Sequence, residues 1–317
     1  MMSRQYRKTF LGLGALVLVG AFTAPAIPAF ASSFSFPVTG ARIVAHFDIA
    51  ALQQPENITL EPNGDTDVTF AYARQVARVT PQGTVTILAA LPAATAGTAA
   101  VSGIVRVPGG TLYVNYVDIG GTESGIWRIS PDGTAEQVVA LPGAKFLNGL
   151  ALDPRTGALF ATDSTLGVVW KVWPRTGKAE IWASGAKLQP GTSGFGANGL
   201  KVHDGSVWVS NSSQGTLLRI PVRPDGTAGS PVAVASGLPS IDDFAFTGTG
   251  DTVLAVQNQL NQAELVAPDG TSHTVLTAAD GLSTPSAVAV RGRTVYVTSA
   301  AYFTGVDPNL LVARLDG

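Results

Sequence analysis

Residues 197–236 read ANGLKVHDGSVWVSNSSQGTLLRIPVRPDGTAGSPVAVAS, and the pattern within this stretch decides the fold. Turn residues separate short apolar runs at intervals of about 8–12 residues, which is the spacing expected of a β-hairpin series. His203-Asp204-Gly205 is the first such turn, and Pro224-Asp225-Gly226-Thr227 is the last. The stretch therefore predicts four short antiparallel strands, around 200–202, 207–209, 217–220 and 232–234.

A turn like the one at 224–227 recurs along the chain. Its glycines stand at positions 83, 133, 177, 226 and 270, and Gly317 ends a sixth copy. Four-stranded units that repeat every 40–50 residues or so are typical of β-propellers. A pair of β-sandwiches is the alternative, but it gives no reason for a sustained period. We therefore predict an all-β chain folded as a six-bladed β-propeller.

The ends of the chain indicate how this propeller closes. The last repeat stops after its third strand, and an unassigned strand lies near the N-terminus at 42–47. Joining that N-terminal strand to the last blade would complete the ring. We predict this closure and a single domain over residues 32–317.

Composition excludes several classes of function. Of the 317 residues, 45% are hydrophobic and 13% charged, which excludes a disordered chain. The formal charge of −2 argues against a nucleic-acid partner. The chain has no cysteine and three histidines, so disulfides, thiolate metal sites and thiol nucleophiles are excluded and a histidine-rich metal centre is not expected. We expect a monomer that acts on a small molecule.

The first 31 residues have the pattern of a secretory signal peptide. Arg4, Arg7 and Lys8 precede an uncharged apolar run at 10–22, and Ala29-Phe30-Ala31 follows as a small-residue cleavage pattern. An uncleaved membrane anchor is the alternative. We predict cleavage after Ala31, secretion, and no membrane attachment of the mature protein.

Candidate site residues stand at one recurring position in the repeats, just before the first strand of a blade. Successive strands of a blade are antiparallel, so the residues before strand one and after strand two should share one end of the central channel. Four such positions carry oxygen donors with a summed charge of −2, which suits Ca²⁺: Glu56, Asn148, Asn198 and Asp242. Taken singly, each could instead be a turn residue or a surface charge.

The same segments resemble those of the senescence-marker-protein/gluconolactonase superfamily of six-bladed propellers, which includes calcium-dependent lactonases. The likeness is carried by Pro55-Glu56-Asn57-Ile58, residues 148–153, residues 197–200 and residues 242–246. It implies a divalent ion, usually Ca²⁺, held by Glu56, Asn148, Asn198 and Asp242. It also implies that the metal acts as a Lewis acid and that Asp242 is the candidate base or nucleophile.

The predicted substrate pocket is largely apolar. Phe146 stands where sugar-lactone members of the superfamily often have a basic side chain, so polar sugar acids are not expected as substrates. We expect the pocket to be formed by Asn115, Tyr116, Phe146, Phe195 and Asp243. The three histidines His46, His203 and His273 are not expected at the site, and His203 is expected to be exposed in a hairpin turn.

These observations predict a secreted, metal-dependent hydrolase of lactones or related esters. Two alternatives stay open. One is a non-catalytic propeller that binds a ligand or partner, and the other is a divergent, metal-free cyclase or condensing enzyme.

Overall fold

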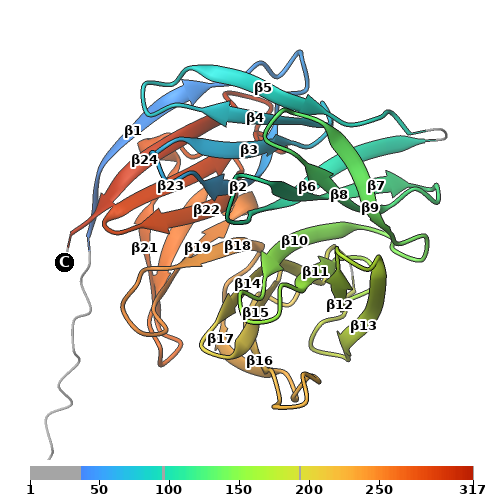
Figure 1. Cartoon of the computed structure of the whole chain (residues 1–317). Helices are drawn as coiled ribbons and strands as arrows, with labels where there is room; N and C mark the ends of the chain where they lie inside the picture. Colours follow the sequence, from blue (N-terminus) through green and yellow to red (C-terminus); the bar gives the residue numbers. More distant parts are fainter. Residues whose placement is uncertain (1–36, 95–96, 193, 317) are drawn as a thin grey trace, which may run out of the picture. The chain divides into compact units, whose positions relative to one another are not determined.

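The computed structural model describes residues 37–94, 97–192 and 194–316, and the proposed signal peptide lies outside them. Within this part of the chain, the strands form six antiparallel sheets of four strands each (Figure 1). The chain is all-β and folds as a six-bladed β-propeller, which confirms the fold prediction. Each sheet is one blade.

Blades one to five each consist of four consecutive strands. Blade one comprises β2 (Pro55–Leu60), β3 (Thr66–Phe70), β4 (Gln75–Val79) and β5 (Val85–Ala90). Blade two comprises β6 (Thr98–Arg106), β7 (Leu112–Ile119), β8 (Gly125–Ile129) and β9 (Ala135–Ala140). Blade three comprises β10 (Leu147–Leu152), β11 (Leu159–Asp163), β12 (Val168–Trp173) and β13 (Lys178–Ser184).

Blade four comprises β14 (Ala197–His203), β15 (Ser206–Asn211), β16 (Thr216–Pro221) and β17 (Val232–Ser236). Blade five comprises β18 (Ile241–Phe246), β19 (Val253–Gln257), β20 (Gln262–Val266) and β21 (Ser272–Leu276). Two short 3₁₀ helices lie in the connections, η1 (Asn258–Leu260) and η2 (Ala278–Asp280). No helix in the described ranges is long and apolar enough to span a membrane.

Blade six joins the two ends of the chain, as the sequence predicts. Its strands are β22 (Pro285–Arg291), β23 (Thr294–Ser299), β24 (Asn309–Leu315) and β1 (Val38–His46), in that order. β1 pairs antiparallel with β24, with Ile43 opposite Leu311 and His46 opposite Asn309 (Figure 1). This pairing gives the last blade its fourth strand and covers the outer edge of β24.

The hydrophobic core lies between neighbouring blades. Buried apolar side chains form six clusters, each with residues from two adjacent sheets. Between blades three and four, for example, Phe160 and Trp182 pack with Val207 and Val209. Burial of each such side chain contributes about 1.5–3 kcal/mol relative to leaving it exposed. The alternation of apolar and polar residues in the repeat therefore supplies the inter-blade packing.

The innermost strands β2, β6, β10, β14, β18 and β22 contact one another in a closed ring. Glycines allow three of these contacts to be very close. A Cβ on Gly103 would lie 2.3 Å from the Asn148 carbonyl oxygen, and one on Gly149 would lie 2.5 Å from the Asn198 carbonyl oxygen. Asn148 and Gly149 are part of β10 and do not form a turn. Position 149 requires glycine because any larger residue would collide with the next blade.

Every innermost strand also has a register irregularity near its start. In β14, for example, the pairing with β15 shifts between Ala197 and Leu200, and the other five strands do the same at equivalent positions. The predicted site residues therefore lie inside the strands, at these bulges, whereas the sequence placed them just before the strands. Bulges redirect the side chains next to them.

Candidate metal site and substrate cavity

A cavity of about 770 Å³ lies where the innermost strands begin, and residues of all six blades line it. The four predicted oxygen donors Glu56, Asn148, Asn198 and Asp242 all line this one cavity. They come from β2, β10, β14 and β18, four separate blades. The structure thus brings together residues that are up to 186 positions apart in the sequence.

The carboxylate of Asp242 is held by two amide groups. Its Oδ1 accepts a hydrogen bond from Asn198 Nδ2 at 2.7 Å, and its Oδ2 accepts one from Asn258 Nδ2 at 2.9 Å. Asn198 Nδ2 also donates to Ser212 Oγ at 2.7 Å. These bonds fix the amide so that Asn198 Oδ1, a buried atom, has no hydrogen-bond partner among the described residues. A buried carbonyl oxygen without a donor is costly unless something else binds it.

The carboxylate of Glu56 is held by a tyrosine from blade six. Tyr302 donates its hydroxyl to Glu56 Oε2 at 2.6 Å, and its ring meets Tyr72 edge-on at 6.0 Å between centroids. Tyr302 follows β23, in the loop before β24, and it also lines the cavity. Tyr302 is not among the residues predicted from the sequence, because nothing in the repeat shows how that loop folds back over the cavity.

Both cavity carboxylates favour the protonated form in the absence of a cation. Burial raises the pKa of Glu56 to about 7, with the Tyr302 hydrogen bond opposing and the charge of Asp243 adding to this rise. Burial also raises the pKa of Asp242 well above its usual range, and the charge of Glu56 raises it further. No lysine or arginine in the described residues forms an ion pair with either carboxylate. Ionisation of either carboxyl in the cavity is therefore not compensated by a cationic side chain of the described residues.

These donors fit a divalent cation. Glu56, Asp242, Asn148 and the unpartnered Asn198 Oδ1 offer carboxylate and amide oxygens, the hard donors that Ca²⁺ prefers. Nearby Asp243 is already paired with Lys201, whose Nζ lies 2.6 Å from Asp243 Oδ1. The remaining two carboxylates match the charge of one divalent ion.

One wall of the cavity is aromatic. Phe146 and Phe195 both line it and stack on each other, with ring centroids 4.8 Å apart. The buried Asp163 fixes the segment that carries Phe146, because its carboxylate accepts hydrogen bonds from the backbone N–H groups of Lys145 and Phe146 at 2.7 and 3.1 Å. Phe303, 64% exposed, stands at the rim. The wall offers apolar surface beside the oxygen donors.

Three residues expected in the pocket do not line it. Asn115 is fully buried in β7 and donates its side-chain amide to the carbonyl oxygens of Asn148 and Gly149 at 2.7 and 3.2 Å, which joins blade two to blade three. Tyr116 packs into the core between blades one and two and bonds to the Pro92 carbonyl oxygen at 3.3 Å. Asp243 is buried in its pair with Lys201.

Asn115 and Tyr116 would lie at the cavity only if the second strand of blade two ended just before them. The strand instead continues to Ile119, paired with the equally extended β6. Both residues are therefore interior strand positions. Asn115 takes a role that Thr69 and Ser210 fill at two other blade junctions, where their hydroxyls donate to the carbonyl oxygens of Ser102 and Asp242 at 2.7 and 2.5 Å.

Among known proteins, no family model matches the chain, and neither does any curated protein. Solved structures do resemble it. Luciferin-regenerating enzyme has a TM-score of 0.64 at 15% identity, over 88% of this chain and 97% of that one. Virginiamycin B lyase from Staphylococcus aureus, in a catalytically inactive form with quinupristin, has a TM-score of 0.58 at 16% identity, over 83% of this chain and 81% of that one.

A third similar structure is an auxiliary nutrient binding protein from Bacteroides thetaiotaomicron. It has a TM-score of 0.66 at 9% identity, over 84% of this chain and 70% of that one. At these identities the likeness shows the fold alone. Enzymes and a binding protein thus share this architecture, and the chemistry of such a fold depends on the residues of its cavity.

Proposed function

We propose that this protein is a metal-dependent hydrolase of small, apolar lactones or related esters. One observation carries the proposal. Two carboxylates and two side-chain amides from four blades line one cavity, next to a stacked pair of phenylalanines. Such a hydrolase needs oxygen donors that bind a divalent cation and an apolar wall that binds a hydrocarbon chain.

The proposed cation is Ca²⁺ or another divalent ion, with Glu56, Asn148, Asn198 and Asp242 as its ligands. When bound, it would supply a Lewis acid for the substrate carbonyl oxygen. Tyr302 holds Glu56, while Asn198 and Asn258 hold the two oxygens of Asp242, so both carboxylates keep their orientation. Such prior fixation lowers the cost of organising the site during reaction.

In this proposal Asp242 is the general base. Its carboxylate takes a proton from a water molecule as the water oxygen bonds to the carbonyl carbon. The ring C–O bond of the lactone then breaks, and the leaving alkoxide receives the proton, which gives a hydroxy acid. Balanced in this way, the reaction consumes one lactone and one water and needs no other co-reactant.

Phe146 and Phe195 would select for apolar substituents on the substrate. Each methylene that they cover contributes about 0.8 kcal/mol of binding free energy. A panel of lactones and aryl esters with increasing alkyl length should therefore show rising kcat/KM. Phe146→Ala should weaken that dependence with little change for the shortest substrate.

The decisive experiment combines metal analysis with this substrate panel. The purified full chain should contain a divalent metal, lose hydrolysis after chelation, and regain it when Ca²⁺ is added back. Glu56→Gln and Asp242→Asn should lower kcat/KM at least about a hundredfold, as expected for removal of an essential ligand or base. Glu180→Gln, an exposed glutamate on β13, is the matched control and should keep full activity. Full activity in both cavity variants would refute the proposal.

A ligand-binding propeller is the second candidate. The described residues that line the cavity include no histidine or cysteine that could activate a nucleophile, and the Ser212 hydroxyl already donates to the Ile241 carbonyl oxygen at 2.6 Å. This candidate predicts that apolar lactones bind in a Ca²⁺-dependent manner without turnover. Calorimetry beside the activity panel separates the two candidates. Secretion and a monomeric state stay predictions of the sequence.

A further inference from the structure

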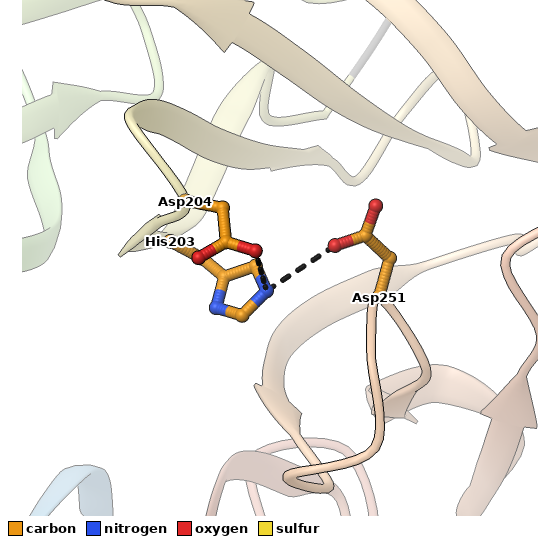
Figure 2. A group of neighbouring side chains, drawn as sticks. All are labelled: His203, Asp204 and Asp251. Carbon is orange, nitrogen blue, oxygen red and sulfur yellow. Dashed lines mark ion pairs between the residues drawn. The ribbon is translucent and has the colours of Figure 1, made fainter.

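A second group of possible metal ligands lies at the opposite end of β14 from the cavity. It consists of His203, Asp204 and Asp251, whose ligand atoms all lie within 4.8 Å of one another (Figure 2). His203 ends β14, Asp204 follows it, and Asp251 comes from the connection between β18 and β19 in blade five. Asn198 at the cavity end of β14 is five residues away, which is about 16 Å along an extended strand.

Both carboxylates are presented by well-defined turns. Asp204 and Gly205 form the two-residue loop between the paired residues His203 and Ser206, with φ values of 42° and 67°. Two successive positive φ values are those of a type I′ hairpin turn. The connection that carries Asp251 is closed by a hydrogen bond from Thr247 N–H to the Thr252 carbonyl oxygen at 3.0 Å. The two loops therefore present their side chains from fixed backbones.

Aromatic contacts fix the imidazole ring of His203. It stacks on Phe246 with a centroid distance of 3.8 Å and an interplanar angle of 19°, and it meets Trp208 edge-on at 6.4 Å. The sequence predicts an exposed histidine here, but only 25% of the His203 side chain is exposed. Figure 2 shows that the Nε2 edge of the ring faces both carboxylates.

The unfilled bonding capacity of this group points to a cation. His203 Nε2 is a buried atom without a hydrogen-bond partner of normal geometry in the described residues, although carboxylate oxygens lie close to it. Neither Asp204 nor Asp251 forms an ion pair with a lysine or arginine among the residues that the structure describes. A neutral imidazole and two carboxylates carry a charge of −2, which one divalent ion balances.

The distances match a particular kind of ion. His203 Nε2 lies 3.2 Å from Asp251 Oδ1 and 3.6 Å from Asp204 Oδ2. In tetrahedral zinc sites the metal lies about 2.0–2.2 Å from nitrogen and oxygen ligands, so two ligand atoms are about 3.4 Å apart. The two observed separations lie on either side of that value. Ca²⁺, by contrast, prefers six to eight oxygens and rarely takes nitrogen.

We propose that His203, Asp204 and Asp251 bind Zn²⁺, with water as the remaining ligand, and that this ion links blades four and five. The linked strands β14 and β18 carry Asn198 and Asp242 at their other ends, so the ion would stabilise the junction on which the cavity depends. This site is independent of the proposed hydrolase function, because it consists of different residues from those of the cavity.

The test is a titration of Zn²⁺ into the metal-stripped full chain, followed by calorimetry and by thermal unfolding. The wild type should bind Zn²⁺ at this site and unfold at a higher temperature when it is loaded. His203→Gln and Asp251→Asn should each remove one equivalent of binding and the associated rise in Tm. Co²⁺ in place of Zn²⁺ should give the intense visible absorption of a tetrahedral site, and both variants should lose that absorption.

Two controls make the result interpretable. His46→Gln removes a histidine that also faces a carboxylate, that of Asp307, and it should leave Zn²⁺ binding unchanged. Glu56→Gln should leave the absorption of Co²⁺ at the His203 group unchanged, because the cavity is a separate site. Circular dichroism verifies that each variant folds. If His203→Gln does not fold, Asp251→Asn alone tests the site. Equal Zn²⁺ stoichiometry and equal Tm shifts in wild type and both variants would overturn the proposal, as would a wild type that binds no Zn²⁺.

Discussion

At the scale of single residues, the cavity holds two buried carboxyl groups whose ionised forms no cationic side chain of the described residues compensates. Asp242 is held by Asn198 and Asn258, and Glu56 by Tyr302, all through neutral donors. Neutral donors fix the geometry of a carboxylate but do not compensate its burial. A cation bound between the two carboxylates would remove this penalty, so the metal-free protein should differ in stability from the metal-bound one.

The raised pKa of Glu56 gives this difference a pH dependence. Its carboxyl has a pKa of about 7 in the folded chain and 4.5 as the ordinary value. Between these values the folded state binds more protons than the unfolded state, so the free energy of unfolding of metal-stripped protein should fall as the pH rises through this window. Urea unfolding at intervals from about pH 5 to pH 8 measures the slope.

Glu56→Gln should reduce this slope, because the variant has no carboxyl to deprotonate, and added Ca²⁺ should reduce it in the wild type. The slope does not vanish, since Asp242 is buried in the same cavity. The exposed Glu180→Gln is the control and should unfold with the slope of the wild type. Identical slopes in wild type and Glu56→Gln would show that Glu56 is already ionised in the metal-free protein.

At the scale of elements, three of the innermost strands, β6, β10 and β14, combine a bulge with a glycine. In β14 the irregular pairing spans Asn198 and Gly199, and a Cβ on Gly199 would lie 2.5 Å from Asp243 Oδ1 and 2.7 Å from the Asp242 carbonyl oxygen. The bulge redirects Asn198, and the glycine lets β18 approach closely enough for the Asn198–Asp242 hydrogen bond. One short segment thus sets both the fold and the site.

Gly199→Ala should therefore damage stability and the site together. Inserting a methyl group into a tight contact costs about 1–3 kcal/mol of unfolding free energy. Because the added carbon meets backbone and carboxylate atoms of 242–243, divalent-ion affinity should fall as well. Gly143→Ala is the matched control, since a Cβ there has no neighbour within 4 Å, and it should change neither property. A Gly199→Ala variant with wild-type stability would contradict the close packing of β14 and β18.

At the scale of the whole molecule, the ring of blades depends on one pairing between segments far apart in the sequence. β1 supplies the outer strand of blade six through its pairing with β24. Without β1, the backbone groups of β24 would form an unpaired edge, which is a template for association with other chains. The closure therefore protects the protein as well as completing its last blade.

Deletion of residues 38–46 should lower the Tm and cause association. The measurements are thermal unfolding and light scattering after size-exclusion chromatography. A chain that begins at residue 37 is the control and should behave as a stable, non-associating protein, because it retains β1 in full. Equal Tm values for the two chains would show that β1 contributes nothing to closure.

The sequence by itself determined the repeat, the strands and the closure, because alternation of side chains and turn geometry are properties of neighbouring residues. The common position of Glu56, Asn148, Asn198 and Asp242 in the repeat was also enough to predict that these side chains line one cavity, as they do. Strands with the same offset in each blade begin at the same end of the channel, so position in the repeat translates directly into position in space.

Only the tertiary structure decided which other residues join them. Tyr302 reaches Glu56 through a loop of blade six, and Asn115 bonds across to blade three and does not line the cavity. His203 likewise meets Asp251 only because blades four and five lie side by side. Such contacts depend on the paths of loops, the lengths of strands and the positions of bulges. The alternation of side chains within strands and the repeat of about 47 residues do not specify these features.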